Sequence, residues 1–263
     1  MTLRFVDLSV PIQEPVPGEL RGGMGAILAA EISYQRHGDT LAECKAMWGA
    51  EPEDVGGVGV GAERLQLTAH AGTHVDAPWH YYPTSEGRPA RTIDQLELDH
   101  FFAPGFVLDV TGHEPGDRIE PDELQAAVER TGAPLSAGEI VCLRFGQDDH
   151  FATERYWDDY PGLGAAATRW LIAQGIKVIG TDAPGLDRGN PYMARDFAAT
   201  GDRSLIWEAH RVGKDHEYFQ IEKLANLGEL PPRGFYVSCF PVKIAGASAG
   251  WCRAVAIFGL PES

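Results

Sequence analysis

The segment from His70 to His80 places three histidines and one aspartate within eleven residues. This is a high density for a chain that holds only nine histidines among its 263 residues. Imidazole and carboxylate groups can hold a divalent metal ion while one coordination position stays open for water. Small residues between them let the backbone bend tightly enough for several side chains to reach one ion. The segment therefore predicts a metal site, and the alternative is a turn of ordinary surface or core histidines.

The spacing of these side chains indicates a loop followed by a short extended segment. His70 and His74 stand four residues apart, as on one face of a helix, but the intervening glycine and the β-branched residues disfavour a helix. A loop after a strand at residues 64–68 fits better, because polar and apolar residues alternate there. His74 and Asp76 are two residues apart, so an extended backbone points both to one side. We predict His70, His74 and Asp76 as metal ligands, with His80 placed to reach the bound water.

Such a site predicts hydrolytic chemistry. A divalent ion held by two neutral imidazoles and one carboxylate keeps a positive charge and lowers the pKa of its bound water toward neutrality. The hydroxide could attack an amide, lactam or ester carbonyl, and His80 suits proton transfer because its unperturbed pKa is about 6.5. Three function classes are open: hydrolysis of an amide or cyclic amide C–N bond, lactone hydrolysis or ring closure, and a non-catalytic metal-binding module. A closed structural site would not need the additional His80.

The same segment carries a family resemblance. It matches His-x-Gly-Thr-His-x-Asp-x-Pro-x-His at every fixed position, and so resembles the metal-dependent hydrolases of the cyclase family, which includes bacterial kynurenine formamidase and isatin hydrolase. Residues 6–9 resemble the opening strand of the family, and residues 180–184 resemble its central Gly-x-Asp segment. The late pair His210 and Glu222, twelve residues apart, is similar to its last conserved block. The resemblance therefore covers nearly the whole chain.

The resemblance implies a role for each of these side chains. His70, His74 and Asp76 would bind one divalent ion, Asp76 would bridge to a second ion held by His210 and Glu222, and His80 would donate and accept protons. Judged by its neighbours alone, Glu222 could lie on the wet face of an ordinary helix or strand, and a single late histidine such as His210 is more often a surface or core residue. One ion or two remain open, and Zn²⁺ and Mn²⁺ both suit the donor set.

Two positions depart from the family pattern. Val16 stands where the formamidase branch carries a tryptophan that stacks on an aryl substrate, which puts aryl-formamide specificity in doubt. The glycine-rich turn at residues 249–253 lacks the usual serine and proline, which puts a serine-mediated proton path in doubt. Trp251 in that turn could form an aromatic wall of the site or a structural contact.

Composition limits the possible partners. A net charge of −16 argues against nucleic acid and anionic membranes, both of which need basic patches, but it says little about a small substrate. The expected substrate, a small carbonyl compound, follows from the site. The four cysteines are scattered, and Cys142 and Cys239 lie in apolar runs that predict burial. The sequence shows no signal peptide and no apolar run as long as a membrane helix, so we expect a cytoplasmic protein.

The remaining patterns predict an α/β fold with a mixed sheet. Helices are expected at residues 39–48, 120–130 and 164–174, and further strands at 106–110, 139–144, 177–180, 235–239 and 252–257. The resemblance adds a single domain over residues 1–263, of the swivelling β/β/α type, with a barrel-like central sheet. Residues 14–62 form a long excursion with more apolar side chains than a solvated loop needs, which predicts a lid or a dimerisation arm and at least a homodimer.

Overall fold

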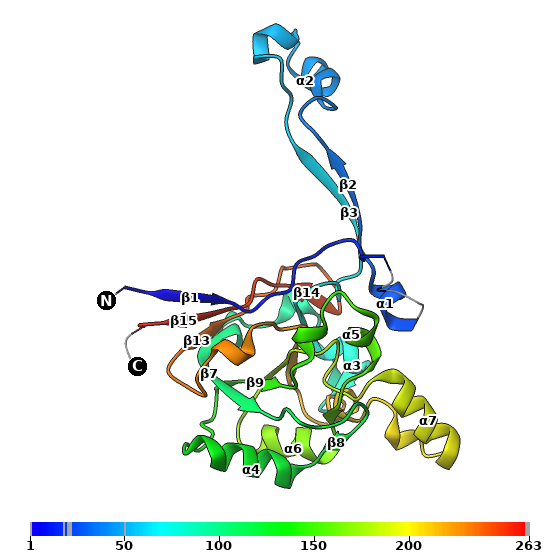
Figure 1. The fold of residues 1–263 in the computed structure, drawn as a ribbon, viewed down its shortest axis with the longest axis vertical. Helices are drawn as coiled ribbons and strands as arrows, with labels where there is room; N and C mark the ends of the chain where they lie inside the picture. Colours follow the sequence, from blue (N-terminus) through cyan, green and yellow to red (C-terminus); the bar gives the residue numbers. More distant parts are fainter. Residues whose placement is uncertain (1, 18, 20–22, 50, 261–263) are drawn as a thin grey trace.

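The computed structural model describes residues 2–17, 19, 23–49 and 51–260. Among these residues, nine strands form one curled mixed sheet (Figure 1). Its strands, in spatial order, are β1 (Arg4–Asp7), β15 (Val255–Phe258), β13 (Tyr236–Ser238), β7 (Phe102–Asp109), β9 (Ile140–Arg144), β11 (Val178–Thr181), β12 (Phe219–Glu222), β4 (His74–Asp76) and β14 (Ala249–Trp251). The four central strands from β7 to β12 are parallel, and the flanking strands pair antiparallel. The predicted α/β fold with a mixed, barrel-like sheet is therefore confirmed.

The central strands are buried on both faces, which explains their continuous apolar sequences. Along β9, Ile140 and Cys142 enter one hydrophobic core, whereas Val141 and Leu143 enter the other. This alternation follows from the two-residue period of a strand. Each face of the sheet therefore needs its own cover.

One core lies between the sheet and helices α4 (Pro121–Thr131) and α6 (Ala165–Ala173), which run along the lower face in Figure 1. Helix α4 begins at a proline, has a capping box between Glu120 and Glu123, and ends at Gly132 in the left-handed conformation with φ 70°. Its buried residues, Leu124 and Ala127, belong to this core, and the helix contacts β7 and α6. These signals explain why the expected helix at residues 120–130 was predicted correctly.

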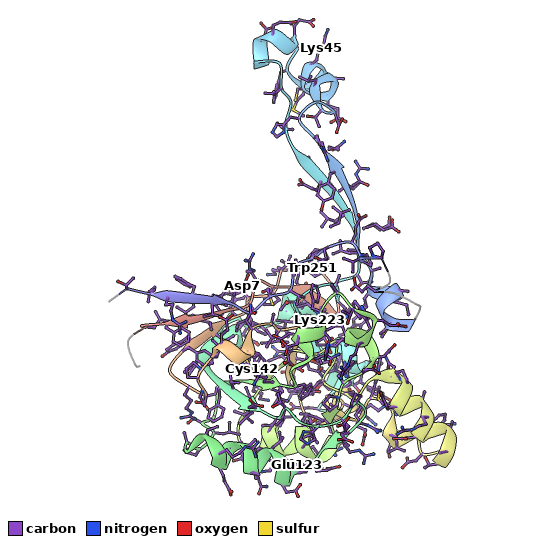
Figure 2. All side chains as sticks on the ribbon, viewed as in Figure 1. Asp7, Lys45, Glu123, Cys142, Lys223 and Trp251 are labelled. Atoms are coloured by element: carbon purple, nitrogen blue, oxygen red, sulfur yellow. The ribbon has the colours of Figure 1, made fainter. Side chains whose placement is uncertain are left out.

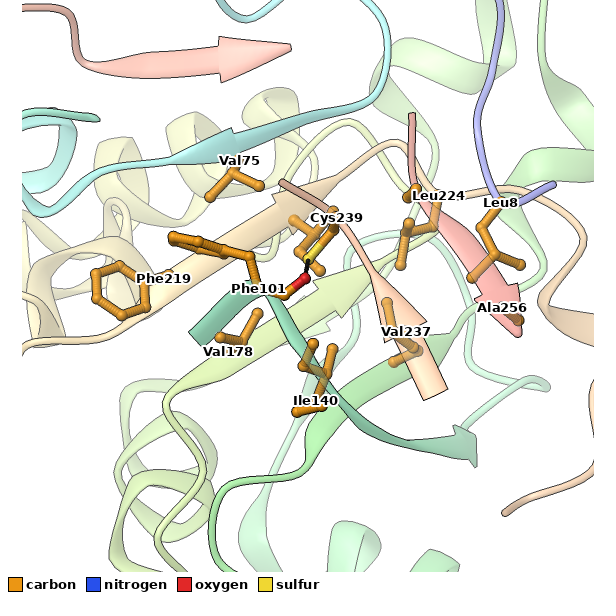
Figure 3. Close-up of a cluster of buried hydrophobic side chains, with 14 of the residues drawn as sticks. Leu8, Val75, Phe101, Ile140, Val178, Phe219, Leu224, Val237, Cys239 and Ala256 are labelled. Carbon is orange, nitrogen blue, oxygen red and sulfur yellow. Dashed lines mark hydrogen bonds between the residues drawn. The ribbon is translucent and has the colours of Figure 1, made fainter. Parts of the chain in front are cut away.

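The second core fills the concave side of the sheet (Figure 3). Val75 from β4 and Phe219 from β12 meet residues of the opposite wall such as Val237 there. Cys142 and Cys239 are fully buried, as predicted, and the Cys239 thiol donates to the Phe101 carbonyl oxygen at 3.6 Å. The core therefore fixes β4, the strand that carries part of the expected metal site.

The expected strand at residues 252–257 is wrong in its first half. β14 ends at Trp251 and β15 begins at Val255, so the chain leaves one edge of the sheet and returns near the other. The residues between them bond to loops: the Cys252 amide donates to the Thr73 carbonyl, and the Ala254 carbonyl accepts from the Leu8 amide. Helix α7 (Asn190–Thr200) was not predicted at all.

A long arm leaves the body (Figure 1). It consists of the hairpin β2 (Glu31–Gln35) and β3 (Ala62–Gln66), with α2 (Leu41–Trp48) at its tip. Helix α1 (Gly23–Leu28) lies at the base of the arm, beside the body. The other elements are α3 (Pro78–Tyr81), α5 (Glu154–Asp158), α8 (Glu208–Val212), β5 (Thr84–Ser85), β6 (Arg88–Pro89), β8 (Arg118–Ile119) and β10 (Gly162–Leu163). Of the helices in the described ranges, none is long and apolar enough to cross a membrane.

Candidate metal centre

Strand β4 holds the central part of the His70–His80 segment within the sheet. It lies between β12 and β14, and its register sets His74 directly opposite Glu222. Because side chains alternate along a strand, His74 and Asp76 share one face while Val75 points into the core. The expected extended backbone at His74 and Asp76 is confirmed.

The residues before β4 form a tight turn rather than a helix, also as predicted. Gly72 has a φ of +60°, and a Cβ atom at this position would lie 2.7 Å from Cγ1 of Ile12. Both the left-handed backbone and the lack of space require glycine here. The turn brings the His70 side chain back over His74.

The six predicted residues converge on one point. His70 Nδ1 lies 2.9 Å from Asp76 Oδ1, and His74 Nε2 lies 3.2 Å from the same oxygen. The Nε2 atoms of His80 and His210 each lie 3.9 Å from Asp76 Oδ2. Glu222 completes the cluster, because its two oxygens lie 3.4 Å from His74 Nε2 and 3.7 Å from His210 Nε2.

The cluster fits a divalent metal ion. Asp76 is fully buried, and among the described residues no backbone amide or hydroxyl donates to its carboxylate oxygens, whose near neighbours are ring nitrogens such as those of His70 and His74. A buried carboxylate without amide or hydroxyl donors is costly unless a cation binds it. Two groups of potential ligand atoms share Asp76: one adds His70 and His80, the other His74 and Glu222. Glu222 is only 5% exposed, so it does not lie on a wet face.

Three of the histidines are oriented from behind by a partner at the nitrogen that faces away from the cluster. His70 Nε2 lies 2.9 Å from Ser248 Oγ, and His74 Nδ1 lies 2.9 Å from the Gly72 carbonyl oxygen. His210 Nδ1 bonds to Asp187 Oδ2. Such partners fix the ring orientation of metal-binding histidines.

Sequence reasoning missed two of these partners. Asp187 also accepts the backbone amides of Ala209 at 2.6 Å and His210 at 3.2 Å, so it fixes the start of α8 as well as the ring. Ser248 lies immediately before the glycine-rich turn, so a serine hydroxyl does reach the site, one residue earlier than the turn itself. No local spacing marks either residue as functional.

The electrostatics of the cluster separate its members. Burial alone would raise the pKa of Asp76, but the neighbouring charges of His80, His70 and His74 hold it well below its usual value. Burial lowers the pKa of His80 to about 4, so its ring is neutral at pH 7 and can accept a proton. Burial would also lower the pKa of His210, but its bond to Asp187 raises it to about 9. A metal ion binding to His210 would therefore displace a proton.

A pocket of about 120 Å³ opens beside the cluster. Its apolar wall consists of Met24, Ile27 and Leu28 from α1, together with Met193 and Trp207. The Trp207 ring stacks on His210 with centroids 5.1 Å apart, and its backbone has a left-handed φ of 55°. Val16 and Trp251 both belong to the part of the chain that the structure describes, and neither lines this pocket. Trp251 is a structural residue, because its indole nitrogen donates to the Thr68 carbonyl oxygen at 2.9 Å.

The central segment at residues 180–184 contributes to the fold rather than to the cluster. Asp182 is fully buried and accepts the backbone amides of Phe145 at 2.9 Å and Gly146 at 2.8 Å. These bonds join the end of β11 to the loop after β9. The segment thus holds two central strands in register near the site.

Known proteins resemble this chain in sequence and in structure. The model of the cyclase family matches residues 6–188. Kynurenine formamidase of Salinibacter ruber is 30% identical over 204 residues, which cover 77% of this chain and 82% of that protein. Kynurenine formamidase of Erythrobacter litoralis is 28% identical over 197 residues, which cover 74% and 76% respectively.

A solved structure shares nearly the whole fold. Isatin hydrolase A from Ralstonia solanacearum superposes with a TM-score of 0.75 at 25% identity, covering 98% of this chain and 92% of that chain. The family match covers well over half of the chain, and these relatives are hydrolases by name. The chain belongs to the cyclase family and is a metal-dependent hydrolase.

Proposed function

We propose that this protein hydrolyses an amide or cyclic amide C–N bond of a small carbonyl compound. The observation that carries the proposal is Asp76, a fully buried carboxylate surrounded by four imidazoles. The relatives named kynurenine formamidase and isatin hydrolase support the choice of an amide bond. They do not favour the lactone hydrolase or cyclase, and a non-catalytic metal-binding module has no support among them.

The ligand assignment follows the family resemblance, whereas distances alone would group His70 and His80, or His74 and Glu222, with Asp76. We assign one ion to His70, His74 and Asp76, and a second ion to Asp76, His210 and Glu222. In the second group, His210 Nε2 lies 3.9 Å from Asp76 Oδ2 and 3.7 Å from Glu222 Oε1. Nitrogen and oxygen donors without a thiolate suit Zn²⁺ or Mn²⁺. When bound, the ion supplies Lewis acidity, which lowers the pKa of water and polarises a carbonyl oxygen.

His80 is the proton-transfer residue in this proposal. Its Nε2 faces the cluster at 3.9 Å from Asp76 Oδ2, and its ring also lines the pocket. The neutral ring can take a proton from the attacking water at Nε2 and return it to the leaving nitrogen of the substrate. The apolar residues of α1 and Trp207 hold the substrate and exclude bulk water from this exchange.

We further propose that the excursion at residues 14–62 has two functions, with its α1 part forming a wall of the pocket and its arm pairing with a second copy of the chain. Tyr34, Met47 and Trp48 on the arm are 64%, 73% and 55% exposed, which is unusual for large apolar side chains that have no partner. A homodimer or higher homo-oligomer would cover them. A cytoplasmic location is proposed with it, supported by four cysteines that are free thiols.

Metal analysis together with activity tests the proposal. The purified protein should retain a divalent ion and hydrolyse at least one of N-formylkynurenine, isatin or a related small amide faster than small lactones. His74→Ala should lose the ion assigned to His70, His74 and Asp76 together with the activity, because the two ligands left to that ion form a weak and open site. His216→Ala, at an exposed histidine, is the matched control and should change neither. A metal content in His74→Ala equal to that of the wild type would refute the assignment.

A further inference from the structure

Lys223 is a buried lysine that the reaction does not use. It directly follows the ligand candidate Glu222, and only 1% of its surface is exposed. Figure 2 places it inside the body, below the base of the arm. Its backbone has a φ of 60°, in the left-handed region that side chains other than glycine rarely adopt. Burying an ammonium group and holding a lysine in this conformation are both unfavourable, so the position needs a compensating role.

The contacts of Lys223 show what it holds. Its ammonium nitrogen donates to the His70 carbonyl oxygen at 2.7 Å. Its carbonyl oxygen accepts from the Thr73 hydroxyl at 2.5 Å, and its amide donates to the Ala183 carbonyl at 3.0 Å. One residue thus fixes both ends of the His70–Thr73 turn and anchors them to the end of β11.

The other hydrogen bonds of the turn hold Ala71 and Thr73, through Thr68, Val10 and Cys252, whereas the bond to the His70 carbonyl comes from Lys223. Among the described residues, the His70 ring has one hydrogen-bond partner on its side away from the cluster, Ser248. On the other side, His70 Nδ1 lies 3.2 Å from His74 Nε2, and both atoms face Asp76. His74 is fixed by its strand, whereas His70 depends on the curvature of the turn. A small rotation of the His70 peptide would carry the ring away from Asp76.

We propose that Lys223 is a positioning residue for the metal centre, which holds the His70 carbonyl and thereby the His70 imidazole in ligand geometry. The inference rests on the proposed metal site and adds a residue to its support. Lys223 does not line the pocket beside the cluster, and its ammonium nitrogen bonds to the His70 carbonyl, so it acts on the site by holding this turn. Its effect is therefore on metal affinity, which can be measured without turnover.

A double-mutant cycle on metal binding tests the proposal. The dissociation constants for Zn²⁺ and Mn²⁺ are measured by competition with a chelating dye for the wild type, Lys223→Met, His70→Ala and the double variant. Loss of a residue that orients a ligand typically costs about 10- to 100-fold in affinity. We expect that loss for Lys223→Met, and no further loss when the same change is made in His70→Ala.

Controls separate positioning from general damage to the fold. Lys177→Met removes an exposed lysine whose ammonium also donates to a carbonyl, that of Glu217 at 3.0 Å, and should leave affinity unchanged. Melting curves without metal check that Lys223→Met is folded; if it is not, Lys223→Gln replaces it in the same cycle. Unchanged or tighter binding in the Lys223 variant, or an equal loss in both backgrounds, would overturn the proposal. If His70→Ala alone binds as tightly as the wild type, the metal assignment itself fails.

Discussion

Replacing Asp187 by asparagine should weaken the metal centre without touching a ligand. Asp187 is 3% exposed and makes three bonds to α8, of which the one to His210 Nδ1 fixes the ring. The pKa of His210 stands at about 9 against an ordinary 6.5, so the site stabilises the protonated ring by about 3 kcal/mol, largely through Asp187. A metal-bound ring carries less charge than an imidazolium, so the expected loss is smaller, about 1.4–2.7 kcal/mol or 10- to 100-fold in affinity.

The effect of Asp187→Asn depends on pH, because protons and metal compete for His210. Below pH 9 the wild type must release a proton from His210 to bind the ion, which lowers its apparent affinity. Asp187→Asn lacks the carboxylate that stabilises the proton on His210, so the pKa of His210 is lower in the variant. The proton therefore stops competing with the metal ion at a lower pH than in the wild type. The difference in metal affinity between the wild type and Asp187→Asn should therefore reach its full value above about pH 9 and be smaller at pH 7.

Chelator-buffered titrations of Zn²⁺ or Mn²⁺ from pH 6 to 9.5 measure both effects. Asp122→Asn, at an exposed aspartate on α4, is the control for the loss of one carboxylate and should match the wild type. Thermal melts without metal check that Asp187→Asn keeps its fold. Equal affinity of variant and wild type above pH 9 would show that His210 is not a ligand or does not depend on Asp187.

Four further predictions concern the site, the assembly and the fold. His80→Ala should keep its metal and lose about 10²–10⁴-fold in kcat; loss of metal together with activity would instead make His80 a ligand. Crystals soaked in Mn²⁺ should show two anomalous peaks roughly 3.5–4 Å apart around Asp76, and a single peak at full occupancy would exclude two-metal catalysis. Light scattering at micromolar concentration should give at least a dimer mass, and a monomer would contradict the pairing of the arm. Burial raises the pKa of Asp182 to about 7 from 3.8, so the folded state holds a proton that the unfolded state releases between these values. The contribution of Asp182 to stability should fall as pH rises from about 4 to 7, so urea titrations should show the wild type losing stability relative to Asp182→Asn over this range.

Local patterns explain which parts of the site could be predicted. The ligands in the His70–His80 segment lie close in sequence, and their residue types alone indicate a metal. His210 and Glu222 needed the family spacing, because each is isolated in its own segment. The partners behind the ligands could not be found this way: Ser248 lies 178 residues from His70, and the bond exists only once β14 joins β4.

The same distinction holds for the fold. Helix α4 has a proline start, a capping box, a glycine end and an apolar stripe, so it was predicted closely. Helix α7 is equally long but buries only Met193, so it has almost no apolar stripe to reveal it. The strand β14 is three residues long and lies in the glycine-rich segment that was expected to be a turn, so only its pairing with β4 defines it as a strand.

The position of β4 in the sheet has a consequence for the order of events during synthesis. β4 is made early, yet both of its neighbours, β12 and β14, come from the last fifth of the chain. A nascent chain that has emerged only as far as α7 exposes the His70–His80 segment without His210, Glu222 or Ser248, and without the strands that would straighten it. Contacts between such distant segments form slowly and late. The full set of candidate ligands, with the partners that orient them, therefore comes together only after β12 and β14 have been made.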